Sequence, residues 1–275
     1  MAFAQAGARP EVSSAWLDFR LAVLEAQQSA LTRLVQGAFG NPGPARTPRV
    51  DVAALDFQEE ALVALSEDLV AAARAHGQPG APLAALQARI GQHAGLGPRI
   101  ARAAAGADAK ALEQLAHEHD VPVDALAFHG RLLAAPFVLR AVVAAVDTHG
   151  VGESPATPRC PFCGSAAALA TLGREDEGAR TLHCGLCGGS WAFTRVACGH
   201  CGQQDQRQLA LLMIEPTDPA WLETCKACGV ALKTFDLRRL PGDLDPLVAD
   251  AASLHLDLLA AREGFATPPM SAALA

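Results

Sequence analysis

The eight cysteines of this chain carry its most distinctive chemistry. All of them lie between residues 160 and 228, where they form four Cys-x-x-Cys pairs. Such pairs supply the thiolate ligands of closed four-sulfur metal centres, whereas disulfide frameworks rarely show this regular spacing. The spacing therefore predicts metal binding by all eight residues, which are Cys160, Cys163, Cys184, Cys187, Cys198, Cys201, Cys225 and Cys228.

A glycine follows each of the four pairs. Glycine lets the backbone turn sharply beneath a bound ion, so that amide N–H groups face the sulfur atoms. Two such turns, brought together by a hairpin, place four thiolates in a tetrahedron. This donor set suits Zn²⁺ and equally suits a single iron ion, so the residues alone leave the metal open.

The pairs also form an internal repeat. Twenty residues separate the first pair from the second, 23 separate the third from the fourth, and only ten lie between the two units. This favours sequential pairing, in which one metal binds the cysteines of residues 160–187 and another binds those of residues 198–228. A cross-braced arrangement, with the first and third pairs together, stays open.

Two histidines beside or within the turns, His183 and His200, are expected at surface-loop positions.

The charge of the cysteine region argues against nucleic-acid binding. Residues 160–228 contain five Lys and Arg against seven Asp and Glu, and each four-cysteine site with a divalent ion adds a further net charge of −2. The whole chain has a net charge of −7. Such a surface repels phosphate backbones and anionic membranes. Two alternative functions remain. The first is a tandem zinc-ribbon protein that binds nucleic acid or acts as a structural interaction module. The second is a rubredoxin-like electron carrier.

Two further regions flank the cysteines. Apolar residues recur at steps of three and four through residues 13–150, which predicts a bundle of about six helices. Helices are expected from residue 13, over residues 59–77, from Pro82, around Leu112, from Pro122, and again after a break at Pro136. Glycine and proline after Val151 mark a linker. A single helix is expected after Pro246, and Gly264 is expected to end it.

These features predict an α+β multidomain protein. It consists of an N-terminal helical bundle, two tandem rubredoxin-like (zinc-ribbon) modules, and a C-terminal helix. The expected parts are a helical domain at 1–152, a first metal module at 153–197, a second metal module at 198–241, and a C-terminal helix with a tail at 242–275, which packs on the rest.

No membrane segment or export signal is expected. The most apolar stretch, residues 132–146, is too short to span a bilayer and contains Pro136 and Arg140. The first residues lack a basic segment followed by an apolar run. We therefore expect a cytoplasmic protein. Nothing in the sequence assembles a nucleophile, a base and an orienting group, so we expect a binding protein and not an enzyme.

Several strings resemble the formate dehydrogenase accessory protein family, FdhE. They are AWLDFRLAVLEAQ near the N-terminus, CPFCGS, LHCGLCGGSWAFTRVACGHCG, CKACGVALKTFDL, and VADAASLHLDLLAAREGF near the C-terminus. The resemblance covers nearly the whole chain, and its most specific part lies between Cys160 and Gly264. This chain departs from the family pattern at Asp250-Ala251, where the family has an acidic pair.

The resemblance implies a function that the residues alone do not establish. It implies a helical domain with two rubredoxin-like modules, and a cytoplasmic assembly or maturation factor for respiratory formate dehydrogenases. The implied partner is the catalytic subunit of such an enzyme. The cysteines are implied to be the metal ligands, with iron as the family's metal. The oligomeric state is left open, with a homo-oligomer among the options.

Overall fold

The computed structural model describes residues 12–34, 47–78, 81–149, 157–174 and 178–271. Contacts divide them into two units. Residues 14–149, together with Ser271, form the first, which we call the helical unit. Residues 157–270 form the second, which we call the sheet unit. The linker that the sequence predicts after Val151 lies mostly outside the described residues.

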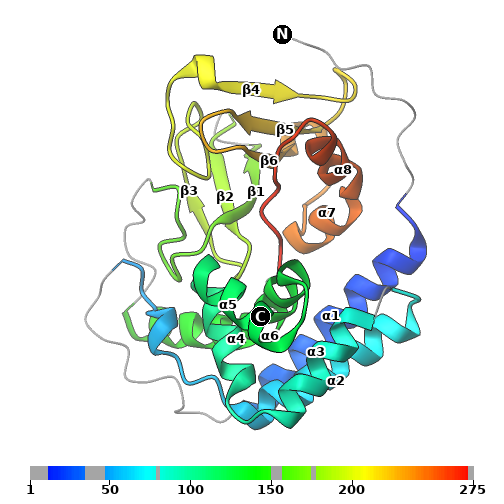
Figure 1. Ribbon diagram of the computed structural model, residues 1–275. Coiled ribbons are helices and arrows are strands. Elements are labelled where there is room, and N and C mark those ends of the chain that lie inside the picture. The colour runs from blue at the N-terminus through cyan, green and yellow to red at the C-terminus, as the bar shows by residue number, and fades with distance from the viewer. Residues whose placement is uncertain (1–11, 35–46, 79–80, 150–156, 175–177, 272–275) are drawn as a thin grey trace. The chain divides into compact units, whose positions relative to one another are not determined.

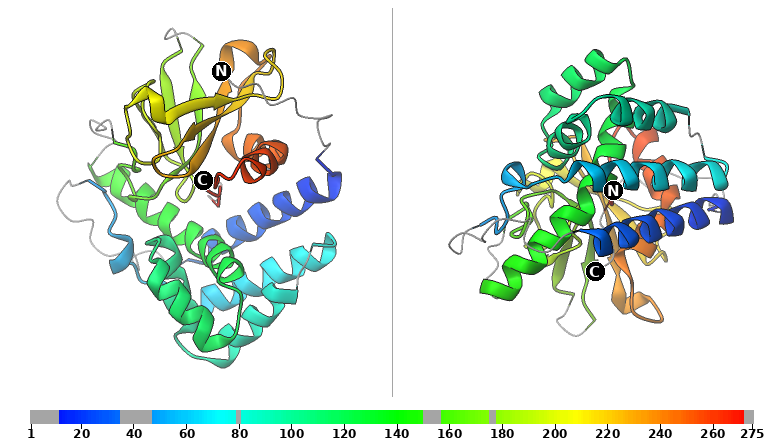
Figure 2. Two further views of the ribbon diagram at one scale, coloured as in Figure 1. Left: turned by 45° about the horizontal axis from the view of Figure 1, so that its top comes forward. Right: turned by 90° about the horizontal axis from the view of Figure 1, so that it is seen from below.

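Helices alone make up the regular structure of the helical unit in its described residues. In chain order these are α1 (Ser14–Arg33), the 3-10 turn η1 (Val52–Ala54), α2 (Glu59–Ala75), α3 (Ala81–Gln92), α4 (Leu96–Ala105), α5 (Ala109–His119) and α6 (Val123–His149). The views in Figure 2 show α1 (blue) alongside α2 (light blue). Aliphatic and aromatic side chains form the buried core, among them Phe57, Leu62, Leu65, Leu86, Ile90, Leu96, Ile100, Leu126 and Phe137.

The predicted break at Pro136 is wrong, because α6 continues through this residue. A proline inside a helix removes the N–H that would bond the carbonyl four residues earlier, here that of Leu132. The side chain of Gln27 on α1 fills this gap, since its Nε2 donates to the Leu132 carbonyl at 2.9 Å. A tertiary hydrogen bond therefore stabilises a helix that local sequence rules would end.

Helix α4 was not expected from the sequence. The segment Gly95-Leu96-Gly97-Pro98 is rich in residues that are typical of loops. Gly95 takes a left-handed conformation at the N-cap, with φ of 77°, and Pro98 lies in the first turn, where a missing N–H costs nothing. The helix forms because Leu96 and Ile100 are buried in the core.

Among the described residues, α6 alone meets the length and composition of a membrane-spanning helix. Residues 123–148 are long and apolar enough to cross a membrane by length and composition. However, 72% of its most apolar window is buried within the protein. The core helix of a bundle shows the same combination, so the length of α6 is weak support for a membrane span.

The sheet unit contains six strands in one mixed sheet. The strands are β1 (Ala167–Leu172), β2 (Arg180–Cys184), β3 (Ser190–Ala192), β4 (Leu209–Leu212), β5 (Ala220–Cys225) and β6 (Val230–Asp236). Their order is β3-β2-β1-β6-β5-β4, with β4 at one edge (Figure 1). Short 3-10 turns, η2 (Gln206–Gln208) and η3 (Leu237–Arg239), precede β4 and follow β6.

The sheet joins two antiparallel ribbons, β1–β3 and β4–β6. Strands β1 and β6 pair in parallel over four residue pairs, from Leu169 with Lys233 to Leu172 with Asp236. The two sets of cysteine turns thus belong to one continuous sheet. The boundary expected at residues 197 and 198 separates the ribbons in sequence, whereas the pairing of β1 with β6 connects them in space. The division into metal modules at 153–197 and 198–241 stays a prediction.

The single C-terminal helix predicted from the sequence is two helices, α7 (Pro246–Ala252) and α8 (Leu254–Arg262), which meet at Ser253. Buried Lys233 on β6 contacts both helices near the break. Its Nζ forms ion pairs with Asp250 and Asp257 and also donates to the Asp250 backbone carbonyl at 3.3 Å. The same carbonyl accepts from the Ser253 N–H at 3.2 Å, a bond to the third residue along the chain that closes the last turn of α7.

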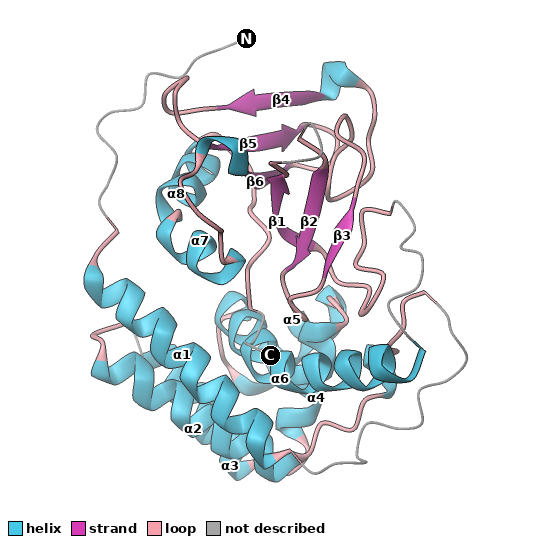
Figure 3. Cartoon of the chain, turned by 180° about the vertical axis from the view of Figure 1, so that it is seen from behind, coloured by secondary structure: helices cyan, strands magenta, loops and turns pink. Residues whose placement is uncertain are grey.

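Helices α7 and α8 lie beside β5 and β6 (Figure 3). Asp245 caps α7 as its sequence position suggests, because its Oδ1 accepts from the N–H of Leu247 at 2.8 Å. Gly264 follows α8 with φ of 80°, as expected for a C-terminal glycine. One small core joins α8 to the sheet through Leu222, Ala231, Leu256, Leu259 and Ala260.

Candidate metal centres

Each cysteine pair lies in a tight turn, and the glycine after the pair adopts the backbone conformation that the turn requires. The glycine after every pair has a positive φ, between 70° and 79°. Side chains other than glycine adopt this conformation only at a cost. In the first pair, the Gly164 N–H donates to the Cys160 carbonyl at 2.8 Å, and the third and fourth pairs repeat this bond. These glycines are Gly164, Gly188, Gly202 and Gly229.

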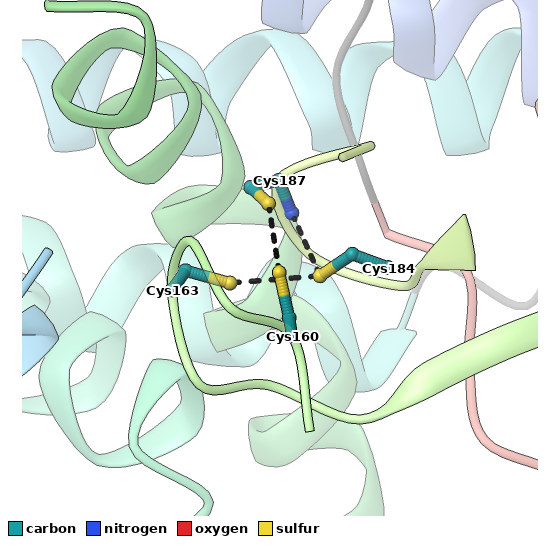
Figure 4. A group of neighbouring side chains, drawn as sticks. All are labelled: Cys160, Cys163, Cys184 and Cys187. Atoms are coloured by element: carbon teal, nitrogen blue, oxygen red, sulfur yellow. Dashed lines mark hydrogen bonds between the residues drawn. The ribbon is translucent and has the colours of Figure 1, made fainter. Parts of the chain in front are cut away.

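The first cluster consists of Cys160, Cys163, Cys184 and Cys187. The first two precede β1, Cys184 ends β2, and Cys187 lies in the turn before β3. Figure 4 shows the four side chains pointing toward one another. Sulfur atoms lie 3.6 Å apart between Cys160 and Cys187, and 3.5 Å apart between Cys163 and Cys184.

The second cluster consists of Cys198, Cys201, Cys225 and Cys228. The turn before η2 supplies the first two, and the hairpin between β5 and β6 supplies the others. Sulfur atoms lie 3.8 Å apart both between Cys198 and Cys228 and between Cys201 and Cys225. Within each cluster, all four sulfur atoms lie within 4.8 Å of one another. The turns are therefore grouped sequentially, and not as a cross-braced arrangement would require.

These separations fit one tetrahedral ion in each cluster. A metal–sulfur bond of about 2.3 Å in a regular tetrahedron gives sulfur–sulfur separations of about 3.8 Å. The sulfur–sulfur separations of 3.5–3.8 Å in the two clusters match this value. Zn²⁺ and iron share the geometry and the donor set, so the sulfur positions do not distinguish them.

The thiols of the first cluster differ in the direction in which their pKa is shifted. Burial raises the pKa of Cys184, but hydrogen bonds from the other three cysteines outweigh burial and hold that pKa well below its usual range. Hydrogen bonds with Cys160 and Cys184, together with burial, hold the pKa of Cys163 well above its usual range. Backbone N–H groups of Leu186 and Cys187 also donate to the Cys184 sulfur, each at 3.4 Å. A divalent cation among the four sulfurs would favour ionisation of them all.

A buried arginine binds the segment that directly precedes the second cluster. The side chain of Arg180 on β2 is completely buried and forms an ion pair with Glu223 on β5. Its Nη1 donates to the carbonyls of Thr194 at 3.1 Å and Ala197 at 2.7 Å, just before Cys198. The sequence predicts no role for Arg180 beyond its place among the five basic residues of this region. The burial pattern of β2, which alternates from residue to residue, places it on the inner face.

Of the two histidines near the turns, His183 differs from the expectation and His200 lies in a turn, as expected. His183 lies on β2 and not on a surface loop, and its Nε2 is 2.9 Å from the Thr171 hydroxyl. Burial lowers its pKa to about 4. His200 lies in the second cluster's turn, where its backbone N–H donates to the Cys198 sulfur at 3.4 Å. In the described part of the chain, neither histidine is among the groups of side chains that could hold an ion.

Comparisons with known proteins connect this arrangement to one family. A family model described as the FdhE central domain matches residues 159–195, and one described as the FdhE C-terminal domain matches residues 196–274. A protein FdhE homolog from Pseudomonas aeruginosa is 34% identical over 260 residues, which cover 86% of this chain and 79% of that relative. A homolog from Aquifex aeolicus is 37% identical over 108 residues, which cover 38% of each chain.

One solved structure shows the same fold. The crystal structure of the FdhE protein from Pseudomonas aeruginosa superposes with a TM-score of 0.54 and 22% sequence identity. The superposition covers 96% of this chain and 99% of that one.

Proposed function

This chain belongs to the FdhE family, and from this premise we propose that it is an accessory protein for assembly or maturation of a respiratory formate dehydrogenase. Its partner in this proposal is the catalytic subunit of that enzyme. The observation that carries the proposal is the paired four-cysteine arrangement, because all eight cysteines lie within the two segments that match FdhE domains.

We further propose that each cluster holds one metal ion, iron or zinc. The ion, when bound, would join two turns that are distant in sequence and stabilise them against unfolding. Cys160, Cys163, Cys184 and Cys187 would hold one ion, and the cysteines of the second cluster would hold the other. The proposed parts of the chain are a helical domain at 1–152, metal modules at 153–197 and 198–241, and a C-terminal segment at 242–275.

The proposed role is binding and not catalysis. In the described residues, a serine and a histidine do approach each other, since Ser66 Oγ lies 2.8 Å from His129 Nε2. Both side chains are completely buried, and His129 Nδ1 has no hydrogen-bond partner there. A nucleophile needs access to substrate and an oriented base, so this pair does not support catalysis. We place the protein in the cytoplasm, where the catalytic subunit would be synthesised.

A pull-down from cytosol prepared without oxygen tests the proposal. The bait is the full chain, and mass spectrometry identifies what it retains. We expect a formate dehydrogenase catalytic subunit with the wild-type protein and with the exposed control Ser29→Ala. With the double variant Cys198→Ser/Cys201→Ser, we expect the amount of retained subunit to fall at least ~10-fold. This decrease corresponds to about 1.4 kcal/mol of binding free energy.

Circular dichroism and metal content, measured on every bait, separate loss of binding from loss of the fold. Recovery of no such subunit from a host that makes one would contradict the proposal. Recovery of nucleic acid in its place would favour the tandem zinc-ribbon alternative.

A further inference from the structure

We propose that the two clusters differ in how firmly they hold their ions. The first is a permanent structural centre. The second is an exchangeable metal site, from which a chelator or a competing soft metal ion removes the ion while the sheet stays folded. This inference rests on the proposed binding of one ion by each cluster.

Exposure of the ligands distinguishes the clusters. In the first, the exposed fractions of Cys160, Cys163, Cys184 and Cys187 are 1%, 4%, 0% and 2%. In the second, Cys201 is exposed and Cys228 is half-buried, and only the remaining two cysteines are buried. A competing ligand must reach a metal–sulfur bond before it can replace the sulfur. The second cluster offers two such bonds at the protein surface.

The turns of the first cluster cover it with their own side chains. The residues between its cysteines include Phe162 and Leu186, which are 7% and 0% exposed. The ring of Phe162 lies so close to Gly189 that a Cβ there would approach the ring to 2.6 Å.

The equivalent positions of the second cluster are polar or small. Lys226 and Ala227 lie between its last two cysteines, and both are exposed. Between the first two cysteines lie Gly199, which has no side chain, and His200, which is half-buried. These turns therefore leave Cys201 and Cys228 open to solvent, whereas Cys198 and Cys225 are buried.

A cavity adds a second approach to the same cluster. It has a volume of about 350 Å³ and is partly open to solvent. Its lining includes Cys198 and Cys225, the two ligands that are buried from the outer surface, together with Leu209 and Leu211 on β4. The cavity lies within the sheet unit. All four ligands of the second cluster are thus close either to the protein surface or to the cavity.

The sheet has contacts that do not depend on the second ion. Strand β6 pairs with β1 on one side and with β5 on the other. Arg180 binds the carbonyls of Thr194 and Ala197, and Lys233 binds the two carboxylates that hold α7 and α8. Loss of the second ion would release Cys201 and its turn, whereas these contacts would keep the strands in place.

The exchange is a ligand substitution with no change of oxidation state. A donor atom of the competing ligand forms a bond to the ion as the bond to the Cys201 sulfur breaks. The released thiolate then takes a proton from water. Repetition of this step at the other three cysteines frees the ion.

Chelation kinetics test the inference on the full chain. The protein is loaded with two equivalents of Zn²⁺ and mixed with excess 4-(2-pyridylazo)resorcinol, whose absorbance reports zinc release. We expect two phases of one equivalent each, with rates that differ at least ~10-fold, a ratio that corresponds to about 1.4 kcal/mol in activation free energy. Cys201→Ser should remove the fast phase and keep the slow one.

Labelling of wild-type protein avoids any variant that fails to fold. Zinc-loaded protein is treated with N-ethylmaleimide for increasing times, and mass spectrometry locates the modified thiols. We expect Cys201 and Cys228 to react first, followed by Cys198 and Cys225, with the first cluster last. Circular dichroism should show folded protein after the fast phase.

The outcomes separate this inference from the proposed function. Two bound ions that leave at equal rates would overturn the inference alone, as would earlier labelling of the first cluster. Unfolding of the sheet together with the fast phase would also overturn it. A chain that binds fewer than two ions would overturn both this inference and the proposed pair of metal centres.

Discussion

His129 is a completely buried histidine in the helical unit. It lies on α6, with Nε2 2.8 Å from the hydroxyl of Ser66 on α2. Burial removes water from the ring and lowers the pKa of His129 to about 4. The native protein therefore keeps this side chain neutral where an unfolded chain, with a pKa near 6.5, would protonate it.

This difference predicts an acid-dependent loss of stability. As the pH falls from about 6.5 to about 4, the unfolded chain binds a proton that the native state does not. The free energy of unfolding should then fall by about 1.4 kcal/mol per pH unit, and this contribution should level off below pH 4. Replacement by glutamine, which is neutral at every pH in this range, should remove the slope.

Urea unfolding of wild type and His129→Gln between pH 4 and 7, monitored by the circular dichroism of the helices, measures how the free energy of unfolding depends on pH. Protonation of the cysteines affects both proteins equally and cancels in the difference. Parallel curves for the two proteins would show that His129 does not cause the acid sensitivity.

At the scale of elements, a glycine sets the distance between two core helices. Gly130 lies on α6 where it crosses α4, and it is buried. A Cβ at this position would lie 2.8 Å from the Cβ of Ala104 and 2.8 Å from Cγ2 of Ile100. Real Cβ atoms do not approach this closely, so a larger residue would force the helices apart.

Gly130→Ala should therefore destabilise the helical unit by about 1–3 kcal/mol through overpacking, despite the better helix propensity of alanine. The matched control is Gly91→Ala on α3, where no atom lies within 4 Å of the added Cβ. The control should stabilise by up to about 1 kcal/mol. Chemical denaturation measures the free energy of unfolding of both variants. Equal effects of the two substitutions would contradict the close packing of α6 against α4 at Gly130.

Elements also show where local sequence rules succeed and where they fail. The rules find α2 and its end at His76, because apolar spacing and a terminal glycine agree there. They fail at Pro136, since the side chain of Gln27, distant in sequence, supplies the missing hydrogen bond. They fail again at Ser253, where Lys233 on β6 forms ion pairs with Asp250 of α7 and Asp257 of α8. At Pro136 a tertiary contact outweighs a local preference.

At the scale of the whole molecule, the two units differ in what stabilises them. The helical unit has an apolar core and contains none of the cysteines. The sheet unit has short strands and small clusters of apolar residues, so the proposed ions would supply much of its folding free energy. Structural zinc contributes about 10–16 kcal/mol in small zinc-binding peptides.

Removal of both ions should therefore unfold the sheet unit and spare the helical unit. After treatment with a strong chelator and a reductant, we expect the near-ultraviolet signals of Trp191 and Trp221 to disappear while most helical circular dichroism persists. Thermal unfolding should show two transitions, of which only one depends on metal. Return of Zn²⁺ should restore the lost signals. A single transition that moves as a whole upon chelation would contradict this expectation.

The spacing of the cysteines predicts which residues gather into the clusters, and the apolar periodicity predicts the helical region before them. Cys-x-x-Cys-Gly is a local signal, because the turn depends only on the glycine and on two sulfurs three residues apart. The tertiary structure decided which turns meet, the joining of two ribbons through β1 and β6, and the unequal exposure of the clusters. Strand order, burial and the position of Arg180 depend on contacts between residues far apart in the chain, and no local pattern specifies those contacts.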